Sequence, residues 1–243
     1  MQLPSFVPAS RGARGLLARS VQELLYHHDF HVEIDSDFGE VTERKLIEFQ
    51  ITKGLAPTGI VDEPTFDALI KPISRATAPI APHGRSLGEM VVAYAHQHLA
   101  EKPCEAIQDN TGPWVRLYMD GIDGSAQYWC AGFACSMYEQ ACETLGIQMP
   151  FPRTVSCDEL AGNAKERGLF VSEPERQEGR AIPPGSLFLS RDSPTDWTHT
   201  GVVIGIDNAV VVSIDGNTNG QGGRNGGSVL KKSRNLLNKD FIL

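Results

Sequence analysis

The sequence predicts an α+β protein, with helices in its first two thirds and an antiparallel sheet in its last third. Apolar residues recur at helical spacing in several segments before residue 170, and glycines follow these segments. After residue 183 the pattern changes to short β-like runs bounded by Gly, Asn, Asp and Pro. Because the two kinds of element follow one another instead of alternating, parallel βαβ units are not expected.

Length and composition narrow the class of protein. The chain of 243 residues is long enough for one large domain or two small ones, and its 41% hydrophobic and 21% charged residues are typical of a soluble protein. A net charge of −8 argues against broad binding to nucleic acid or to an anionic membrane. No apolar run is long enough to span a membrane.

Cysteine usage and the first residues bear on localisation. The five cysteines are an odd number without a CxxC pair, which favours a reducing compartment over a disulfide framework. Residues 1–20 contain three arginines but no continuous apolar core, so we expect no secretory signal and synthesis in the cytoplasm.

Residues 1–73 are expected to form a small three-helix unit. Turn residues separate three short helical patterns, the second of which ends at Gly54. Asp62 is the expected N-cap of the third helix, with Pro64 tolerated in its first turn. The apolar positions of the three patterns are Val21, Leu24, Leu25 and His28; Leu46, Ile47, Phe49 and Gln50; and Phe66 and Leu69.

Residues 74–86 are expected to be a linker, made semi-rigid by Pro79 and Pro82. The second unit, 87–243, opens with a helix predicted over residues 87–100. A further helix is predicted from Asp158 to Gly168. Four β-like runs follow, at residues 186–190, 200–206, 210–215 and 228–232.

A cysteine at a helix start is the central feature of the second unit. Helical spacing after Cys130 continues to Leu145, and Gly146 supplies a stop signal. Unpaired N–H groups and the helix dipole at such a position stabilise an anion and lower a thiol pKa. Cys135 and Cys142 lie further along the same helix and are expected to pack inward, whereas Cys104 and Cys157 receive no role.

A nucleophilic cysteine needs a base and an orienting polar group, and both types occur in the β-like region. His199 is the candidate base, and either Asp215 or Asn217 is the candidate that orients the imidazole. Taken singly, His199 is an ordinary strand-edge histidine and Asp215-Gly216-Asn217 an ordinary turn. Their joint presence after Cys130 favours the catalytic interpretation.

The first unit contains a specific series of residues: Asp37-Phe38-Gly39, Thr42, Phe49-Gln50, Gly54-Leu55, Thr58-Gly59-Ile60-Val61-Asp62 and Thr65. In this series the unit resembles the peptidoglycan-binding domain found at the ends of many cell-wall hydrolases. The resemblance covers roughly fifty residues.

The second unit resembles the CHAP family of cysteine, histidine-dependent amidohydrolases and peptidases, which are papain-like and cut peptidoglycan. Four motifs carry the resemblance in the family's order: Trp129-Cys130-Ala131, Pro184-Gly185-Ser186-Leu187-Phe188, His199-Thr200-Gly201-Val202-Val203 and Ile214-Asp215-Gly216-Asn217-Thr218. It implies a papain-like domain of helices packed on an antiparallel sheet. Cys130 would be the nucleophile, His199 the general base, and Asp215 or Asn217 the orienting residue.

Together the resemblances imply a peptidoglycan hydrolase that contacts the wall through both units and cleaves an amide bond, as an N-acetylmuramoyl-L-alanine amidase or a peptide endopeptidase. The Cys130 N–H, with Gln127, Tyr128 and Trp129, would line the oxyanion hole and substrate groove. Secretion machinery or a holin-type release would bring the protein to the wall. The alternatives are an inactive wall-binding protein and an acyl-transfer enzyme acting on another amide.

No cofactor is implied. Asp120 and Asp123 precede Cys130 in a loop where some relatives bind calcium. Two acids without further spaced ligands do not define such a site, so no metal is expected.

Strand register decides whether the candidate side chains can meet. A loop of three residues, Asp207-Asn208-Ala209, would pair Val202 with Ile214, Ile204 with Val212 and Ile206 with Val210. We expect this loop, or an equivalent one-residue bulge, in place of a two-residue turn at Asp207-Asn208. His199 would then lie opposite Asn217 and diagonal to Asp215. The small residues on the His199 face were expected to leave room for the Cys130 helix.

Overall fold

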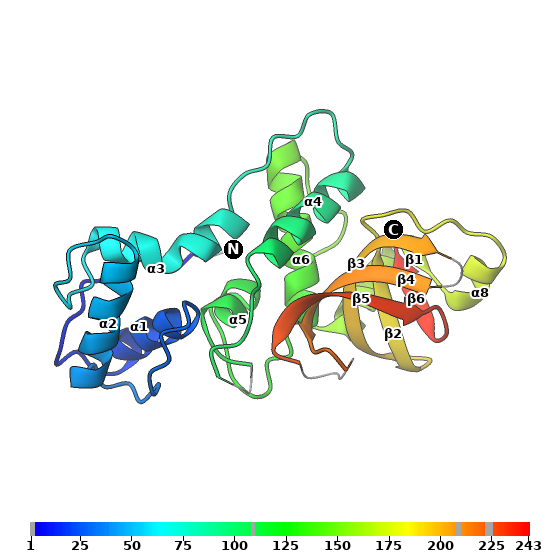
Figure 1. Cartoon of the computed structure of the whole chain (residues 1–243). Coiled ribbons are helices and arrows are strands. Elements are labelled where there is room, and N and C mark those ends of the chain that lie inside the picture. The colour runs from blue at the N-terminus through cyan, green and yellow to red at the C-terminus, as the bar shows by residue number, and fades with distance from the viewer. Residues whose placement is uncertain (1–2, 108–109, 208–209, 222–225) are drawn as a thin grey trace.

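The computed structural model describes residues 3–107, 110–207, 210–221 and 226–243. It confirms the α+β class: helices precede a six-stranded sheet whose strand order is β1-β6-β2-β3-β4-β5 and whose neighbours are all antiparallel. Figure 1 shows α1–α3 at one end, the sheet at the other, and α4, α5 and α6 between them.

The N-terminal helices are α1 (Leu16–Tyr26), α2 (Glu40–Thr52) and α3 (Glu63–Ala76). Their core contains the fully buried Leu25, Phe38, Leu46 and Phe49. The predicted cap of α3 is confirmed, because an Asp62 carboxylate oxygen accepts a hydrogen bond from the Thr65 N–H at 3.0 Å.

The segment expected to be a linker lies against helix α4 (Leu87–Ala100), which has the predicted bounds. Helix α3 runs on to Ala76, past the expected end of the first unit. Gln97 of α4 donates to the carbonyl oxygens of Ala76 and Ala78 at 2.9 and 2.8 Å, and the Ile80 N–H donates to the Tyr94 hydroxyl at 3.1 Å.

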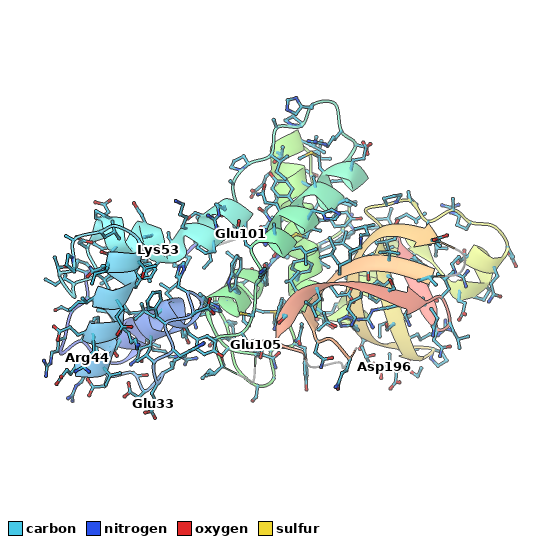
Figure 2. The ribbon with its side chains drawn as sticks, in the orientation of Figure 1. Glu33, Arg44, Lys53, Glu101, Glu105 and Asp196 are labelled. Carbon is cyan, nitrogen blue, oxygen red and sulfur yellow. The ribbon has the colours of Figure 1, made fainter. Side chains whose placement is uncertain are left out.

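Arg75 of α3 forms a two-bond ion pair with Glu101, which Figure 2 places where α3 approaches the central helices. Several bonds therefore hold residues 75–80 against α4.

Four more helices complete the α part: α5 (Pro113–Tyr118), α6 (Cys130–Leu145), α7 (Cys157–Glu166) and α8 (Glu173–Gln177). Helix α6 ends as predicted at Gly146, which adopts a left-handed conformation with φ 66°. Cys135 and Cys142 are buried, as predicted. The sequence patterns did not predict α5 or α8. Helix α6 packs against α4 and against strands β3 and β4.

The four predicted β-like runs are strands β2 (Leu187–Ser193), β3 (Asp196–Asp207), β4 (Val210–Thr218) and β5 (Ser228–Asn235). Two strands were not predicted, β1 (Phe170–Val171) and β6 (Lys239–Ile242). The C-terminal strand β6 lies between β1 and β2, so this edge of the sheet joins segments far apart in the sequence.

The predicted register is confirmed near the site, and the one-residue bulge expected as an alternative to the three-residue loop is confirmed with it. The two further pairs predicted for the three-residue loop are wrong. Val202 pairs with Ile214, but the register shifts at a bulge between Val203 and Gly205. Beyond the bulge, Gly205 pairs with Val212 and Ile206 with Val211, in place of the two predicted pairs. The expected loop residues Asn208 and Ala209 lie outside the described residues.

Helix α6 packs closely against the sheet at Gly216. We expected it to pack on the face of the sheet that carries His199. A Cβ at Gly216 would lie 2.6 Å from the Cβ of Phe133 and 3.0 Å from the Trp129 ring. A Cβ at Gly201 would instead meet the Asp215 carboxylate at 2.3 Å. Glycine at these two positions therefore admits α6 on one side and the Asp215 side chain on the other.

Among the described residues, no helix has the length and apolar character needed to cross a membrane.

Candidate active site

Cys130 is the first residue of α6 and is 4% exposed. Its thiol interacts with the Cys157 thiol, the His199 imidazole and the Thr200 backbone, and these contacts hold its pKa well below the ordinary value despite the opposing effect of burial. These contacts therefore favour the thiolate form of Cys130, the form in which sulfur is nucleophilic.

His199 lies on β3 and is 5% exposed, and its Nε2 is 3.2 Å from Oδ2 of Asp215. Burial alone would lower the imidazole pKa, but the Asp215 carboxylate and the Cys130 sulfur raise it from 6.5 to about 9. Within the described part of the chain the other ring nitrogen, Nδ1, is buried without a hydrogen-bond partner. The Cys130 sulfur and the His199 imidazole thus favour each other's charged forms, thiolate and imidazolium.

Asp215 is fully buried on β4 and remains ionised. Burial would raise its pKa, but the contacts with His199, Arg234 and Ser213 bring it below the ordinary value. The Ser213 hydroxyl donates to Oδ1 at 2.6 Å, and Nη2 of Arg234 donates to Oδ2 at 2.6 Å. One carboxylate therefore binds the imidazole, a hydroxyl and a guanidinium.

Arg234 is a member of this cluster that the sequence patterns missed. It comes from β5, beyond the end of the predicted run at residue 232, and its Nη2 is also 3.3 Å from Nε2 of His199. Its guanidinium carbon lies 5.5 Å from the centre of the Phe188 ring. No motif marks Arg234, because its contact with Asp215 depends on how β4 and β5 pair.

Asn217 is not brought to His199. It adopts a left-handed conformation with φ 50°, its Nδ2 donates to Oδ1 of Asn110 at 2.9 Å, and its Oδ1 accepts from the Gly226 N–H at 3.0 Å. Both ends of its amide therefore join loops beside the cluster. Of the two candidates for orienting the imidazole, the structure places Asp215 against the ring.

The three residues before Cys130 differ in exposure. Tyr128 is 52% exposed and Gln127 is partly buried, so both remain accessible next to the helix start. Trp129 was expected in the groove, but its side chain is fully buried, stacks on Tyr118 at 5.5 Å and donates to Glu105 at 3.0 Å. Its ring therefore supports the core instead of lining a groove.

Cys157 is the second residue of the cluster that the sequence patterns missed. It is the first residue of α7, is 8% exposed, and its Sγ lies 3.7 Å from Sγ of Cys130. The interaction with Cys130 and burial raise the pKa of Cys157 well above its ordinary value. Cys157 is therefore a protonated neighbour of the Cys130 thiolate.

Asp120 and Asp123 do not fit a calcium site. Asp120 forms an ion pair with Arg153 at 2.9 Å, and Asp123 forms one with Arg116 at 2.5 Å. Each carboxylate already faces a guanidinium, and the described residues contain no metal-binding group of three or more His, Cys, Asp or Glu.

Buried charges connect the N-terminal helices with α5. Arg116 of α5 forms ion pairs with Glu23 of α1, whose side chain is fully buried, and with Asp123. Arg19 of α1 also reaches both acids. A cavity of about 590 Å³ lies beside this cluster, with Leu24, Leu69 and Leu117 among its lining residues.

Residues 14–69 match the family model described as "Putative peptidoglycan binding domain". Comparison with curated proteins and with solved structures gives no significant match. The match covers α1, α2 and the first half of α3, so it confirms the resemblance of the N-terminal unit and supports peptidoglycan as a partner of the chain.

Proposed function

We propose that this protein is a peptidoglycan hydrolase that cleaves an amide bond of the cell wall by a thiol mechanism. The observation that carries the proposal is the cluster at the start of α6, where a buried thiolate at Cys130 faces His199 and a buried carboxylate at Asp215 binds the imidazole. The family match of residues 14–69 supplies the substrate class.

Each residue would have a distinct part in the reaction. The Cys130 thiolate attacks the carbonyl carbon of the scissile amide and forms an acyl-enzyme. The protonated His199 donates its proton to the leaving amine, then takes one from the water that hydrolyses the acyl-enzyme. Asp215 fixes the ring orientation and stabilises the imidazolium, while Arg234 and Ser213 keep the carboxylate ionised.

The oxyanion of the tetrahedral intermediate would be bound at the helix start. The N–H of Cys130 belongs to the first turn of α6, where backbone N–H groups lack partners within the helix. Gln127, only partly buried before that turn, is the side-chain donor that we assign to the same oxygen. Tyr128, exposed beside it, is the side chain that we assign to contact with the wall peptide.

Digestion of purified sacculi tests the proposal. We expect soluble fragments with new free amino groups, and their masses distinguish cleavage at the muramoyl–alanine amide from cleavage within the peptide. Cys130→Ala and His199→Ala should each abolish release, whereas Cys142→Ala, which removes a buried cysteine on the same helix, should retain it. Binding to sacculi without release by the wild type would instead support an inactive wall-binding protein.

An acyl-transfer enzyme remains the alternative that uses the same residues. It would form the same acyl-enzyme at Cys130 but pass the acyl group to an amine instead of water. Incubation of sacculi with an added amine separates the two, since a hydrolase yields free carboxylates and a transferase yields amine-bearing fragments.

A further inference from the structure

Two helix N-termini meet at a pair of cysteine sulfurs. Cys130 begins α6 and Cys157 begins α7, and their Sγ atoms lie 3.7 Å apart although the residues are separated by 27 positions. Both side chains are buried. The mechanism proposed above needs Cys130 but gives Cys157 no part.

We propose that Cys130 and Cys157 are a disulfide-forming pair, in which a peroxide oxidises Cys130 and Cys157 resolves the product. A disulfide bond is about 2.05 Å long, so the sulfurs would have to approach by less than about 2 Å. Rotation about the Cα–Cβ bond of either residue moves its sulfur on this scale. The closure therefore requires only local adjustment in the first turn of one helix.

The thiol pKa values of the two cysteines are shifted in opposite directions, which assigns oxidation to Cys130 and resolution to Cys157. Cys157 donates toward Cys130 and, with His199 and the Thr200 backbone, keeps the pKa of Cys130 low. Peroxides react with thiolates, so Cys130 is oxidised first. Cys157 stays protonated, with its raised pKa, and lies within reach of the oxidised sulfur.

Cys135 is the other cysteine near the pair, and its chemistry is different. Burial raises the pKa of the Cys135 thiol to about 11. It is therefore a neutral thiol at physiological pH and a poor target for peroxide. Burial also raises the pKa of Cys142, whereas that of Cys130 is lowered, so Cys142 is a matched control on α6.

The reaction balances in two steps. The Cys130 thiolate attacks one peroxide oxygen, the O–O bond breaks, and the products are a sulfenic acid and hydroxide, which takes up a proton to give water. The Cys157 sulfur then attacks the Cys130 sulfur, the S–O bond breaks, and hydroxide leaves with the Cys157 proton as a second water. Two thiols and one hydrogen peroxide become one disulfide and two waters.

Tryptic mapping of the full chain after treatment with hydrogen peroxide tests the pair. Trypsin cleaves after Arg116, Arg153 and Lys165, so Cys130 lies in peptide 117–153 and Cys157 is the only cysteine of peptide 154–165. We expect these two peptides to be joined after peroxide treatment and separated again by dithiothreitol. Fragment masses of the joined peptides should place the bond on Cys130.

Variants make the assignment specific. Cys130→Ala and Cys157→Ser should each lose the cross-link, whereas Cys142→Ser should retain it. In Cys157→Ser, Cys130 should instead proceed to the sulfinic and sulfonic acids, which dithiothreitol does not reverse. A cross-link that persists in Cys130→Ala would overturn the proposal. So would a wild-type protein whose Cys130 becomes sulfinic acid without forming any cross-link.

The expected effect of the disulfide on hydrolysis rests on the proposed function. The formation of the disulfide itself does not depend on that function. If the protein is a thiol hydrolase, the disulfide occupies the nucleophile, so peroxide should abolish release from sacculi and dithiothreitol should restore it. A reduced protein without activity that still forms the cross-link would contradict the proposed function and leave the cysteine pair established. An active protein that forms no cross-link would support the proposed function and contradict the cysteine pair.

Discussion

An oxygen of the Asp215 carboxylate lies 3.2 Å from Nε2 of His199, and both residues are buried. A buried carboxylate is costly unless it is paired, and here it is paired twice, with His199 and with Arg234. The imidazole is consequently fixed through Nε2, which leaves Nδ1 as the nitrogen that can exchange a proton with Cys130 or a substrate.

Asp215→Asn should shift the alkaline limit of activity. The raised pKa of His199 means that its protonated form is the one favoured by the fold, so activity that needs the imidazolium should fall as pH rises through about 9. The amide removes the carboxylate that raises this pKa, so the limit should move to lower pH and kcat/KM should fall about a hundredfold or more. The measurement is hydrolysis of soluble peptidoglycan fragments across pH.

Asn217→Ala is the control for that experiment. Asn217 binds Asn110 and Gly226, so its loss should affect stability and leave the alkaline limit in place. An alkaline limit that moves in Asn217→Ala but not in Asp215→Asn would assign the orienting role to the amide.

Alkylation by iodoacetamide should report the Cys130 thiolate directly. Because the pKa of Cys130 lies well below the ordinary value, its alkylation rate should already be at a plateau at neutral pH. Cys142 is also buried on α6, but its pKa is raised, so it should react only in alkaline solution. Fragment masses of peptide 117–153 distinguish the two. A Cys130 rate that climbs through pH 9 like that of a free thiol would contradict the ion pair.

Local sequence patterns predict much of the fold and much of the candidate site. Helix starts and stops at Asp62 and Gly146, and the pairing of Val202 with Ile214, followed from periodicity and turn chemistry alone. Cys130, His199 and the pair Asp215 and Asn217 are candidates because they occur together in one order along the chain, and only the structure distinguishes Asp215 from Asn217.

The remaining features depend on contacts between distant segments. Arg234 reaches Asp215 from a neighbouring strand, and Cys157 meets Cys130 because two helix starts converge. A one-residue bulge was one of two expected ways to reach this register, but its position at Ile204 depends on how β3 pairs with β4. Trp129 follows the exposed Tyr128, and only its packing with Tyr118 makes it a core residue.

Glu23→Gln should destabilise the protein although it lies far from Cys130. The Glu23 side chain is fully buried against Arg116, and loss of its charge leaves the guanidinium with Asp123 as its acidic partner. We expect a loss of about 1–3 kcal/mol in the free energy of unfolding. Arg44→Ala is the matched control, because the Arg44–Glu40 pair is exposed and contributes about 0.5 kcal/mol or less (Figure 2). Chemical denaturation measures both variants. Equal losses of unfolding free energy would show that the buried Glu23–Arg116 pair stabilises the protein no more than the exposed pair does.

Removal of residues 1–86 should separate wall binding from chemistry. The deletion takes away the matched segment 14–69 but none of the residues around Cys130, so hydrolysis of soluble fragments should persist. Action on intact sacculi should fall about tenfold or more, because a tethered binding unit raises the local concentration of the active site at the wall. The deletion also removes Glu23 from Arg116 and Arg19 from Asp123, and it removes the bonds of α4 to Ala76 and Ala78, so the melting temperature should fall. Circular dichroism must therefore confirm that the shortened chain is folded at the assay temperature. A folded 87–243 fragment that is inactive on soluble substrate would mean that the N-terminal helices shape the active site itself.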